Sequence, residues 1–464
     1  MADNIRFMLN DDPVGLSGVS PMTTLLDWLR EHRGLKGTKE GCAEGDCGAC
    51  TVVLERDGPN GQVRREAVNA CIAMLGQVDG LSVRTVEGLR GTDGSAHSVQ
   101  IAMAEADATQ CGFCTPGFVM SAYAFSAGGE TADADTIHEA LAGNLCRCTG
   151  YRPIVDAMTK VAGLAVEPAP SVPARTASAV FDGAFFAPRS LDELLKLRKA
   201  HPEAMLLAGG TDLGLLAGHR RQPPKEIIHL AHVPELAAIA SDKESITLGA
   251  AVTYAQAMPL LVAAYPALRP YLSRLGSRQI RNLGTIGGNV GNASPIGDMP
   301  PVLLALEATV TLASVRGTRE LPLEDFFTGY RETALAPDEV ILSLSMPCLR
   351  PGEVFFCDKV SKRRDQDIST VAAGYRLRIE DGRIADVRVG IGGMAATPRR
   401  ATHVEKALLK EGFAAAAAAI PKDFQPIDDW RGSAAYRLQV AANLLRRLEL
   451  RIAQPARVLE VEAL

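Results

Sequence analysis

The chain has 464 residues, about three times the length of a typical domain, so a single small module is excluded and several hydrophobic cores are predicted. Hydrophobic residues at 47% and charged residues at 22% are typical of folded domains and exclude a largely disordered chain. A net charge of -5 disfavours nucleic acid as a partner, and without a secretory signal or a long apolar run the chain is expected to be cytoplasmic, with no membrane association.

Residues 1–88 are predicted to form a small α+β domain. A helix is predicted over residues 25–30, with Thr23 or Thr24 as its N-cap. A turn is predicted at residues 57–61. Patterns of apolar residues predict strands over residues 5–9, 14–19, 51–55 and 81–86.

The cysteines are concentrated near the N-terminus, since eight of the ten lie between residues 42 and 148. Metal ligation explains this crowding better than disulfides, because nothing in the sequence indicates an oxidising compartment. The first set has the spacing C-x4-C-x2-C followed after 20 residues by a fourth cysteine, and comprises Cys42, Cys47, Cys50 and Cys71. This spacing is typical of plant-type [2Fe-2S] ferredoxins, whereas zinc sites favour paired C-x2-C units. Three residues without a Cβ allow backbone N–H groups to approach the sulfurs: Gly41, Gly45 and Gly48.

Residues 89–163 are predicted to form a helical-bundle domain, with helices after His97 and over residues 137–145 and 154–161. Pro116 suits a first helical turn. In this region C-x2-C is followed by C-x-C, which gives a second set of Cys111, Cys114, Cys146 and Cys148. Its spacing alone allows zinc, a redox dithiol or an iron–sulfur cluster. A position at helix ends, where helix N-termini stabilise thiolates, favours the iron–sulfur cluster.

Residues 164–178 contain three prolines among small and polar residues, which predicts an extended linker. Residues 179–346 are predicted to alternate strands and helices, with a strand at 181–186, a helix at 190–199 and an apolar strand at 205–208. The last domain, residues 347–464, has predicted strands at 376–380 and 387–391 and helices that include 414–419 and 433–448.

Two glycine-rich turns follow strands in the third domain. The first spans residues 208–213, and the second spans residues 284–289 and leads into residues 292–298. Such turns can present backbone N–H groups to a pyrophosphate. Neither has the G-x-G-x-x-G pattern, so a Rossmann site is not predicted, and either turn alone is more typical of an ordinary chain reversal.

The cysteine-bearing segments KEGCAEGDCGAC (39–50), QCGFCTPG (110–117) and GNLCRCTGY (143–151) resemble the two [2Fe-2S] domains of the molybdenum hydroxylases. That family includes xanthine dehydrogenase, aldehyde oxidase and carbon monoxide dehydrogenase. Residues 206–359 resemble its FAD domain, which is related to the vanillyl-alcohol oxidase flavoproteins. The resemblance covers essentially the whole chain and implies a multidomain α+β fold. Its domains would be a β-grasp ferredoxin-like domain, a helical-bundle [2Fe-2S] domain, an α+β FAD domain of the vanillyl-alcohol oxidase type and a C-terminal α+β flavoprotein domain.

The resemblance also implies the cofactor sites. Both cysteine sets would hold [2Fe-2S] clusters. The second cluster would face a molybdenum cofactor, and Gln110 would form a hydrogen bond with the pterin of that cofactor. At Leu275 xanthine dehydrogenases carry a Phe against the flavin ring, so an aliphatic contact would replace aromatic stacking. The implied FAD-binding residues are Leu206, Leu207, Ala208, Gly209, Gly210, Thr211, Asp212, Leu213, Leu275, Thr285, Ile286, Gly287, Gly288, Asn289, Asp298, Ile341 and Lys359.

No catalytic residue is expected on this chain, because the cofactors carry the chemistry and the protein sets their distance and potential. The resemblance implies a large molybdenum-binding partner subunit that hydroxylates the substrate, with two copies of each chain. Electrons would pass from it through the second cluster, the first cluster and FAD to NAD. A purine substrate, hypoxanthine or xanthine, is expected. The alternatives are another molybdenum hydroxylase that acts on an aldehyde or N-heterocycle, and a free-standing NADH-dependent iron–sulfur flavoprotein reductase.

Other chemically active residues are interpreted as structural. His229 and His232 could share a helical face, but no nearby ligand completes a metal site, so ordinary packing is predicted. Cys348 and Cys357 are interpreted as structural thiols because no activating neighbour is evident. The basic run 362–364 is predicted to be a solvated face, in a segment that lies near the flavin in the resembling family.

Overall fold

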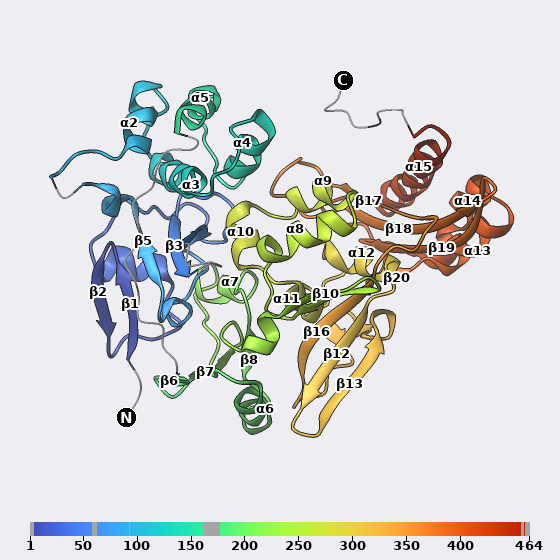
Figure 1. Ribbon diagram of the computed structural model, residues 1–464, viewed down its shortest axis with the longest axis horizontal. Helices are drawn as coiled ribbons and strands as arrows, with labels where there is room; N and C mark the ends of the chain where they lie inside the picture. The colour runs from blue at the N-terminus through green and yellow to red at the C-terminus, as the bar shows by residue number, and fades with distance from the viewer. Residues whose placement is uncertain (1–3, 58–62, 92, 162–176, 456–458, 460–464) are drawn as a thin grey trace. The chain divides into compact units, whose positions relative to one another are not determined.

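The computed structural model describes residues 4–57, 63–91, 93–161, 177–455 and 459 (Figure 1). The chain divides into two compact units. The first unit comprises Met1–Pro234, Thr253–Ala255 and Gly276–Gly284, and the second comprises Glu235–Val252, Gln256–Leu275 and Thr285–Leu464. Both units combine strands and helices, and the predicted multidomain α+β fold is confirmed. Most of the predicted turn at 57–61 and of the linker at 164–178 lies outside the described residues.

A five-stranded mixed sheet begins the first unit, in the order β2-β1-β5-β3-β4. β1 and β5 are parallel and the other neighbours are antiparallel, which is the β-grasp pairing. Alternation along β1 buries Ile5, Phe7 and Leu9 on the core face. β2 is shifted from the predicted 14–19 because the chain turns at Gly18, whose φ is +71°. The strands are β1 (Ile5–Leu9), β2 (Asp12–Leu16), β3 (Thr51–Asp57), β4 (Val63–Asn69) and β5 (Ser82–Arg84).

A short helical segment packs into the core of this sheet. α1 (Leu25–Asp27) continues as a π-helical turn over Trp28–His32, and 3-10 turns follow later at Leu75–Val78 and Val86–Leu89. Of the two predicted caps, Thr24 is the one used, because its hydroxyl accepts a hydrogen bond of 3.0 Å from the Asp27 N–H. Trp28 packs edge-on against Phe7, with ring centroids 5.4 Å apart.

Four helices follow, and α3 lies at their centre against β3 and β4 (Figure 1). Nearly every α3 residue from Gly117 to Ser126 is buried, which explains its uniformly apolar composition. The predicted helix at 137–145 ends earlier, because residues 142–151 form the loop that carries Cys146 and Cys148. The helices are α2 (Ser98–Glu105), α3 (Thr115–Ala127), α4 (Ala134–Leu141) and α5 (Arg152–Val161).

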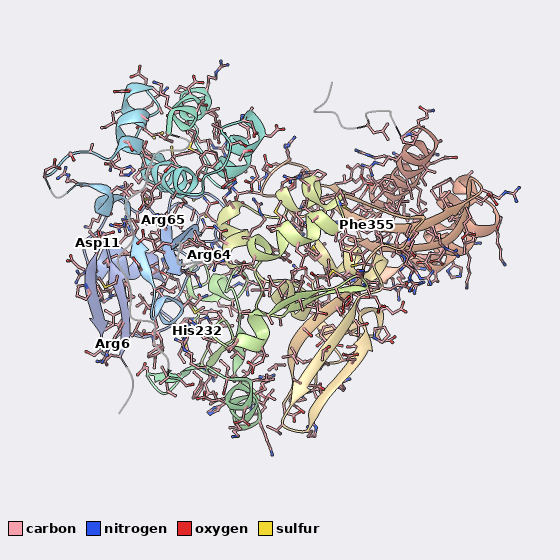
Figure 2. The ribbon with its side chains drawn as sticks, viewed as in Figure 1. Arg6, Asp11, Arg64, Arg65, His232 and Phe355 are labelled. Carbon is pink, nitrogen blue, oxygen red and sulfur yellow. The ribbon has the colours of Figure 1, made fainter. Side chains whose placement is uncertain are left out.

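A buried ion network joins the sheet to α3. Glu55 on β3 accepts hydrogen bonds from Arg65 at 3.1 Å and from the Tyr123 hydroxyl of α3 at 3.4 Å. Arg84 lies 3.5 Å from the same carboxylate and also pairs with Asp11 at 2.5 Å. Figure 2 labels Arg65 and Asp11, which lie at opposite ends of this network. Because each buried charge has partners, the network holds the sheet and helical domain in one register.

The first unit ends in a small four-stranded sheet of order β6-β7-β9-β8. The predicted strand at 181–186 is wrong as a single element. Asp182 and Gly183 both have positive φ, so the chain reverses there and makes two strands. The helix predicted at 190–199 is present as α6, and Ser190 is its N-cap. The elements are β6 (Ala179–Phe181), β7 (Phe185–Ala187), α6 (Leu191–Ala200), β8 (Met205–Leu207), α7 (Gly214–Ala217), β9 (Ile227–His229) and α10 (Arg278–Leu283). A 3-10 turn (Pro234–Ala237) begins at the last residue of the segment Met1–Pro234 and continues into the second unit.

The second unit contains a five-stranded antiparallel sheet of order β10-β11-β16-β12-β13. Its strands are β10 (Ile239–Ser241), β11 (Ser245–Gly249), β12 (Thr309–Ser314), β13 (Gly317–Pro322) and β16 (Val340–Pro347), and a small hairpin is formed by β14 (Phe327–Gly329) and β15 (Glu332–Thr333). The helices that accompany it are α8 (Tyr254–Ala264), α9 (Leu268–Ser273), α11 (Ile286–Gly291), α12 (Met299–Ala305) and a 3-10 turn (Leu323–Asp325).

A four-stranded antiparallel sheet and three helices complete the second unit. The predicted strands at 376–380 and 387–391 are parts of longer strands, and α14 contains the predicted alanine run. Arg437 of α15 is 2% exposed and donates hydrogen bonds to the carbonyls of Thr370 and Gly393, which ties this helix to the sheet. The elements are β17 (Glu353–Val360), β18 (Val371–Glu380), β19 (Arg383–Gly392), β20 (Arg399–Arg400), α13 (Thr402–Lys410), α14 (Phe413–Asp423) and α15 (Ala434–Ala453).

Among the described residues, none of the helices combines the length and the apolar composition needed to span a lipid bilayer.

Candidate functional site

The first cysteine set converges on one point of the ferredoxin-like domain. The Cys42 thiol makes side-chain hydrogen bonds with Cys47 and Cys71, and Cys50 makes one with Cys71. These shared hydrogen bonds lower the pKa of the Cys42 and Cys50 thiols and raise the pKa of the Cys47 and Cys71 thiols, so the four sulfurs share protons that a bound metal would displace. Cys50, directly before β3, and Cys71, two residues after β4, are buried, whereas Cys42 and Cys47 in the loop are partly exposed.

Backbone geometry in the loop directs N–H groups at the first set. The Cys42 sulfur accepts hydrogen bonds from the N–H groups of Glu44 at 3.4 Å and of Asp46 and Cys47 at 3.3 Å. The chain curls around this sulfur through positive φ at Ala43 and Gly45. Such N–H donors stabilise the negative charge of a thiolate-bound cluster, so the predicted role of the loop agrees with its geometry.

The second set forms two close thiol pairs, Cys111 with Cys148 and Cys114 with Cys146. Cys114 is the residue at the N-cap of α3, where Pro116 occupies the first turn as predicted. The expectation that both pairs lie at helix ends is correct for Cys114 only, since Cys146 and Cys148 lie within the loop between α4 and α5. Burial raises the pKa of Cys114 to about 12, so a bound cation is needed to hold this thiol deprotonated.

The surroundings of the second set are more exposed than those of the first. Cys111 and Cys148 are exposed, and so are Gln110 and Phe113 beside them. The loop is held by Tyr151, a residue that the sequence analysis did not single out, whose hydroxyl accepts a hydrogen bond of 3.0 Å from the Cys146 N–H. An exposed edge of this kind is where a partner could approach within electron-transfer distance.

The donors of both sets fit two-iron clusters. Each set offers four neighbouring thiols, and a [2Fe-2S] cluster takes four cysteines, two at each iron. Within the described ranges, no three His, Cys, Asp or Glu side chains group around a single metal ion. The eight cysteines are therefore the residues that would hold the two clusters, and the clusters would supply one-electron redox chemistry.

The first glycine-rich turn lies in the first unit, and its two glycines leave the backbone uncovered by side chains. At Gly209 an added Cβ would lie 1.7 Å from the Leu283 carbonyl oxygen, and Gly210 has a φ of +79°. Gln77 donates a hydrogen bond of 3.3 Å to the Gly209 carbonyl and holds the turn against the ferredoxin-like domain. The predicted FAD-binding residues on either side differ in exposure, since Leu207 is buried and Asp212 is exposed. The turn therefore presents backbone groups, as a pyrophosphate site requires.

Replacing Gly209 by alanine is expected to distort this turn, because the clashing carbonyl belongs to the backbone. We expect the free energy of unfolding to fall by about 3 kcal/mol and the purified protein to contain less FAD. Urea unfolding and flavin absorbance measure the two effects. Gly15→Ala is the control, since an added Cβ there meets no atom within 4 Å. Equal stability and flavin content in the two variants would contradict this assignment.

The second glycine-rich turn, in the second unit, begins α11. Thr285 accepts a hydrogen bond of 2.9 Å from the Gly288 N–H, and a Cβ at Gly287 would lie 2.4 Å from the Ala250 carbonyl oxygen. The Oδ1 atom of Asn289 is buried and, within the described part of the chain, has no hydrogen-bond partner. A buried acceptor without a donor is costly unless a ligand supplies one, so this turn fits the predicted dinucleotide.

Asp298 and Lys359 form a buried ion pair in the second unit. The Lys359 ammonium and the Ser369 hydroxyl each donate a hydrogen bond of 2.5 Å to the Asp298 carboxylate. Tyr271 donates from its hydroxyl to the Asp298 carbonyl at 2.6 Å. Tyr271 and Ser369 carry no sequence signal of this site, because they lie 27 and 71 residues from Asp298. The cluster pairs every charge, so its carboxylate keeps a defined orientation.

Two predicted apolar flavin contacts are buried in the same unit. Leu275 and Ile341 are each 7% exposed. The Ile341 side chain lies 3.3 Å from the position that a Cβ would occupy at Gly291, so this glycine leaves room for the isoleucine. That Leu275 contacts the flavin without aromatic stacking stays a prediction from the sequence.

The histidine pair lies on a strand end and a turn, so the suggestion of a shared helical face is wrong. His229 ends β9 and its ring lies 4.9 Å from that of His232, which Figure 2 labels. His229 Nδ1 and His232 Nε2 are buried, and among the described residues neither has a hydrogen-bond partner. The His229 ring packs against Phe185, as the predicted structural role requires.

The histidine pair predicts a loss of stability in acid. Burial lowers the pKa of His232 to about 3, with added repulsion from Arg189 and Arg56, and burial lowers the pKa of His229 well below 6.5. The folded chain therefore keeps both imidazoles neutral, whereas the unfolded chain binds protons near pH 6.5. Because the unfolded state binds more protons, stability falls as the pH drops below that value, by about 1.4 kcal/mol per pH unit for each imidazole.

Urea unfolding between about pH 6.5 and pH 5 measures this slope. A His229→Phe/His232→Gln variant is expected to lose most of it, and the difference between the two proteins removes any acid effect on the cofactors. If the free energy of unfolding of the variant changes with pH as steeply as that of the unmodified protein, other titrating groups cause the loss of stability in acid.

Four family models match consecutive parts of the chain. A 2Fe-2S iron-sulfur cluster binding domain matches residues 7–75, and a [2Fe-2S] binding domain matches residues 85–159. The FAD binding domain in molybdopterin dehydrogenase matches residues 179–349, and the CO dehydrogenase flavoprotein C-terminal domain matches residues 357–452. The chain thus has two [2Fe-2S] binding domains and an FAD-binding domain.

Xanthine dehydrogenases are similar to this chain in sequence. The xanthine dehydrogenase/oxidase of Gallus gallus is 32% identical over 481 residues, which cover 85% of this chain and 35% of the relative. The xanthine dehydrogenase of Emericella nidulans is 33% identical, with coverages of 89% and 35%. The chain therefore spans about a third of the length of these relatives.

Two solved structures share the fold of more than half of the chain. A chain of carbon monoxide dehydrogenase from Hydrogenophaga pseudoflava has a TM-score of 0.54 and 29% identity, covering 57% of this chain and 94% of that one. A chain of quinoline 2-oxidoreductase from Pseudomonas putida 86 has a TM-score of 0.54 and 28% identity, with coverages of 59% and 97%. With its two [2Fe-2S] domains, its molybdopterin-dehydrogenase FAD domain and these relatives, this chain belongs to the molybdenum hydroxylase family of oxidoreductases.

Proposed function

We propose that this chain is the electron-transfer subunit of a xanthine dehydrogenase. Electrons from the hydroxylation of hypoxanthine or xanthine would reach it from a molybdenum centre on a large partner subunit, and would pass through the second set, the first set and FAD to NAD. The observation that carries the proposal is the gathering of eight thiols into two sets within one compact unit, ahead of a flavin-binding domain. Sequence similarity to xanthine dehydrogenases supports the purine substrate.

The proposal of a separate partner subunit is supported by the solved structures. This chain covers 94% and 97% of single chains of carbon monoxide dehydrogenase and quinoline 2-oxidoreductase, so chains similar to part of this one exist as separate polypeptides. We propose two copies of each subunit in a cytoplasmic complex. The proposed domain limits are 1–88, 89–163, 179–346 and 347–464, with the eight cysteines as iron ligands and the FAD-binding residues as predicted from the sequence.

Purification of the native complex tests this proposal. A large subunit containing molybdenum should co-purify with the tagged chain, and the complex should reduce NAD with xanthine or hypoxanthine as the donor. A parallel panel of aldehydes and N-heterocycles tests the other molybdenum hydroxylases, for which the similarity to quinoline 2-oxidoreductase is the supporting observation. A preference for these substrates would reassign the substrate and keep the electron-transfer role.

The free-standing reductase makes a different prediction. In that case the chain would purify without a large subunit or molybdenum, and NADH alone would reduce its clusters. That result would overturn the proposed role as a subunit.

A further inference from the structure

The two cysteine sets are joined by a direct backbone contact. The Leu145 N–H donates a hydrogen bond of 3.0 Å to the Cys47 carbonyl. Cys47 belongs to the first set, and Leu145 is covalently bonded to Cys146 of the second set. A short run of covalent bonds with one hydrogen bond therefore leads from the sulfur of Cys47 to the sulfur of Cys146. Electron tunnelling is faster through such a bonded path than across a gap, because each break in the bonding raises the barrier.

The neighbouring residues hold this contact in register. Asn144 is 3% exposed and donates hydrogen bonds from its amide nitrogen to the Gly48 carbonyl at 3.0 Å and to the Thr51 hydroxyl at 3.3 Å. The loops approach so closely that a Cβ at Gly48 would lie 2.1 Å from the Gly143 carbonyl oxygen. These hydrogen bonds thus hold the residues on both sides of the Cys47–Leu145 hydrogen bond at a fixed distance.

Two further side chains hold Asn144 itself. Ser121 of α3 donates a hydrogen bond of 2.6 Å to the Asn144 side-chain oxygen. Gln279 of α10 donates to the same oxygen at 3.0 Å, and its amide nitrogen also lies 3.2 Å from the Ser121 hydroxyl and 3.3 Å from that of Thr51. Gln279 is fully buried. Residues from the ferredoxin-like domain, the helical domain and α10 therefore meet in one polar network within the first unit.

A network of this kind needs an explanation, because buried amides and hydroxyls contribute less to stability than apolar side chains of the same size. A connected polar network instead specifies one arrangement of the groups that it joins. Here the arrangement that it specifies is the distance between the Cys47 carbonyl and the Leu145 N–H.

We propose that Ser121, Asn144 and Gln279 are positioning residues that set the rate of electron transfer between the two cysteine sets through the Cys47–Leu145 hydrogen bond. This rests on the proposed electron-transfer function. One electron passes per step: the iron held by the second set is oxidised from ferrous to ferric, and the iron held by the first set is reduced from ferric to ferrous. No covalent bond forms or breaks, and no proton is transferred.

A matched pair of variants on α3 tests the proposal. Ser121 and Ser126 are both 3% exposed, and each hydroxyl donates one short hydrogen bond. The Ser121 hydroxyl donates to Asn144, whereas that of Ser126 donates at 2.9 Å to the Tyr123 carbonyl, outside the network. Ser121→Ala and Ser126→Ala therefore remove the same atom from the same helix and differ in whether the network is broken.

Flash reduction of the purified holoprotein by a photoexcited flavin analogue, followed by rapid freezing and electron paramagnetic resonance, gives the rate of redistribution between the two clusters. In Ser121→Ala this rate should fall by about tenfold, the lower range for loss of an outer hydrogen-bond partner of a metal ligand. The Leu145 amide should also exchange faster with deuterium. Ser126→Ala should match the unmodified protein in both measurements, and both variants should keep their iron.

The outcomes separate the two proposals. Equal redistribution rates in the two variants, or an unchanged Leu145 exchange rate in Ser121→Ala, would overturn the positioning role and leave the proposed function intact. An unmodified protein whose clusters accept no electrons would instead overturn the proposed function. A Gln279→Met variant provides a second test at the opposite side of the network, with the same expected slowing.

Discussion

Replacing Cys71 by alanine is expected to remove the iron of the first set and to leave that of the second, so that iron falls from about four to about two atoms per chain. The thiol of Cys71 is buried and contacts both Cys42 and Cys50, so its loss takes a ligand from the centre of the set. The second set lies in a separate loop system and keeps its four thiols. Iron analysis and low-temperature electron paramagnetic resonance distinguish the two centres.

Cys357 provides the control for this substitution. It is also buried, at 7% exposure on β17, and its thiol donates to the Ala267 carbonyl at 3.2 Å outside both sets. Cys357→Ala creates a similar cavity and should retain about four iron atoms. If Cys71→Ala also retains them, or if both variants lose them, the assignment of the first set is incorrect.

Replacing Lys359 by methionine is expected to lower the free energy of unfolding by about 3–5 kcal/mol, because the Asp298 carboxylate would remain charged in a buried site. The Lys359 side chain is 1% exposed and that of Asp298 is 12% exposed. The remaining bond from Ser369 does not replace a full positive charge. Since Asp298 is also a proposed FAD residue, the flavin content should fall with the stability. Urea unfolding and flavin absorbance measure both effects.

The exposed pair Lys196–Asp192 is a matched control for the buried one. Its nitrogen–oxygen distance is likewise 2.5 Å, but the two side chains are 69% and 76% exposed. Lys196→Met should change the free energy of unfolding by at most about 0.5 kcal/mol, because water and salt screen an exposed i,i+4 pair. A similar loss in the two variants would show that burial does not govern the Lys359–Asp298 pair.

Local features of the fold could be predicted because their physical causes are local. The cap at Thr24 and the first-turn Pro116 depend on a few neighbouring residues, and both are present as expected. The single strand predicted at 181–186 is wrong, and the cause of this difference is also local. Its apolar residues indicate a strand, but the positive φ angles at Asp182 and Gly183 turn the chain within it.

Long-range partners could not be predicted. Ser369 and Tyr271 reach Asp298 from positions 71 and 27 residues away, and Gln279 reaches Asn144 across 135 residues. Serine, tyrosine and glutamine occur throughout any sequence, so their identity alone does not indicate a site. Their contacts exist only once separate elements have packed.

The sequence by itself determined which residues form the two cysteine sets, because the ligand spacing of an iron–sulfur loop is a pattern of positions that lie close together in the chain. The sequence also indicated the glycines of both turns. Only the tertiary structure decided that the Leu145 N–H meets the Cys47 carbonyl and that Asn144 is clamped by Ser121 and Gln279. The physical reason is the length of chain on which each feature depends. Ligand spacing follows from the reach of a few residues of chain, whereas a hydrogen bond between domains depends on the packing of every element between them.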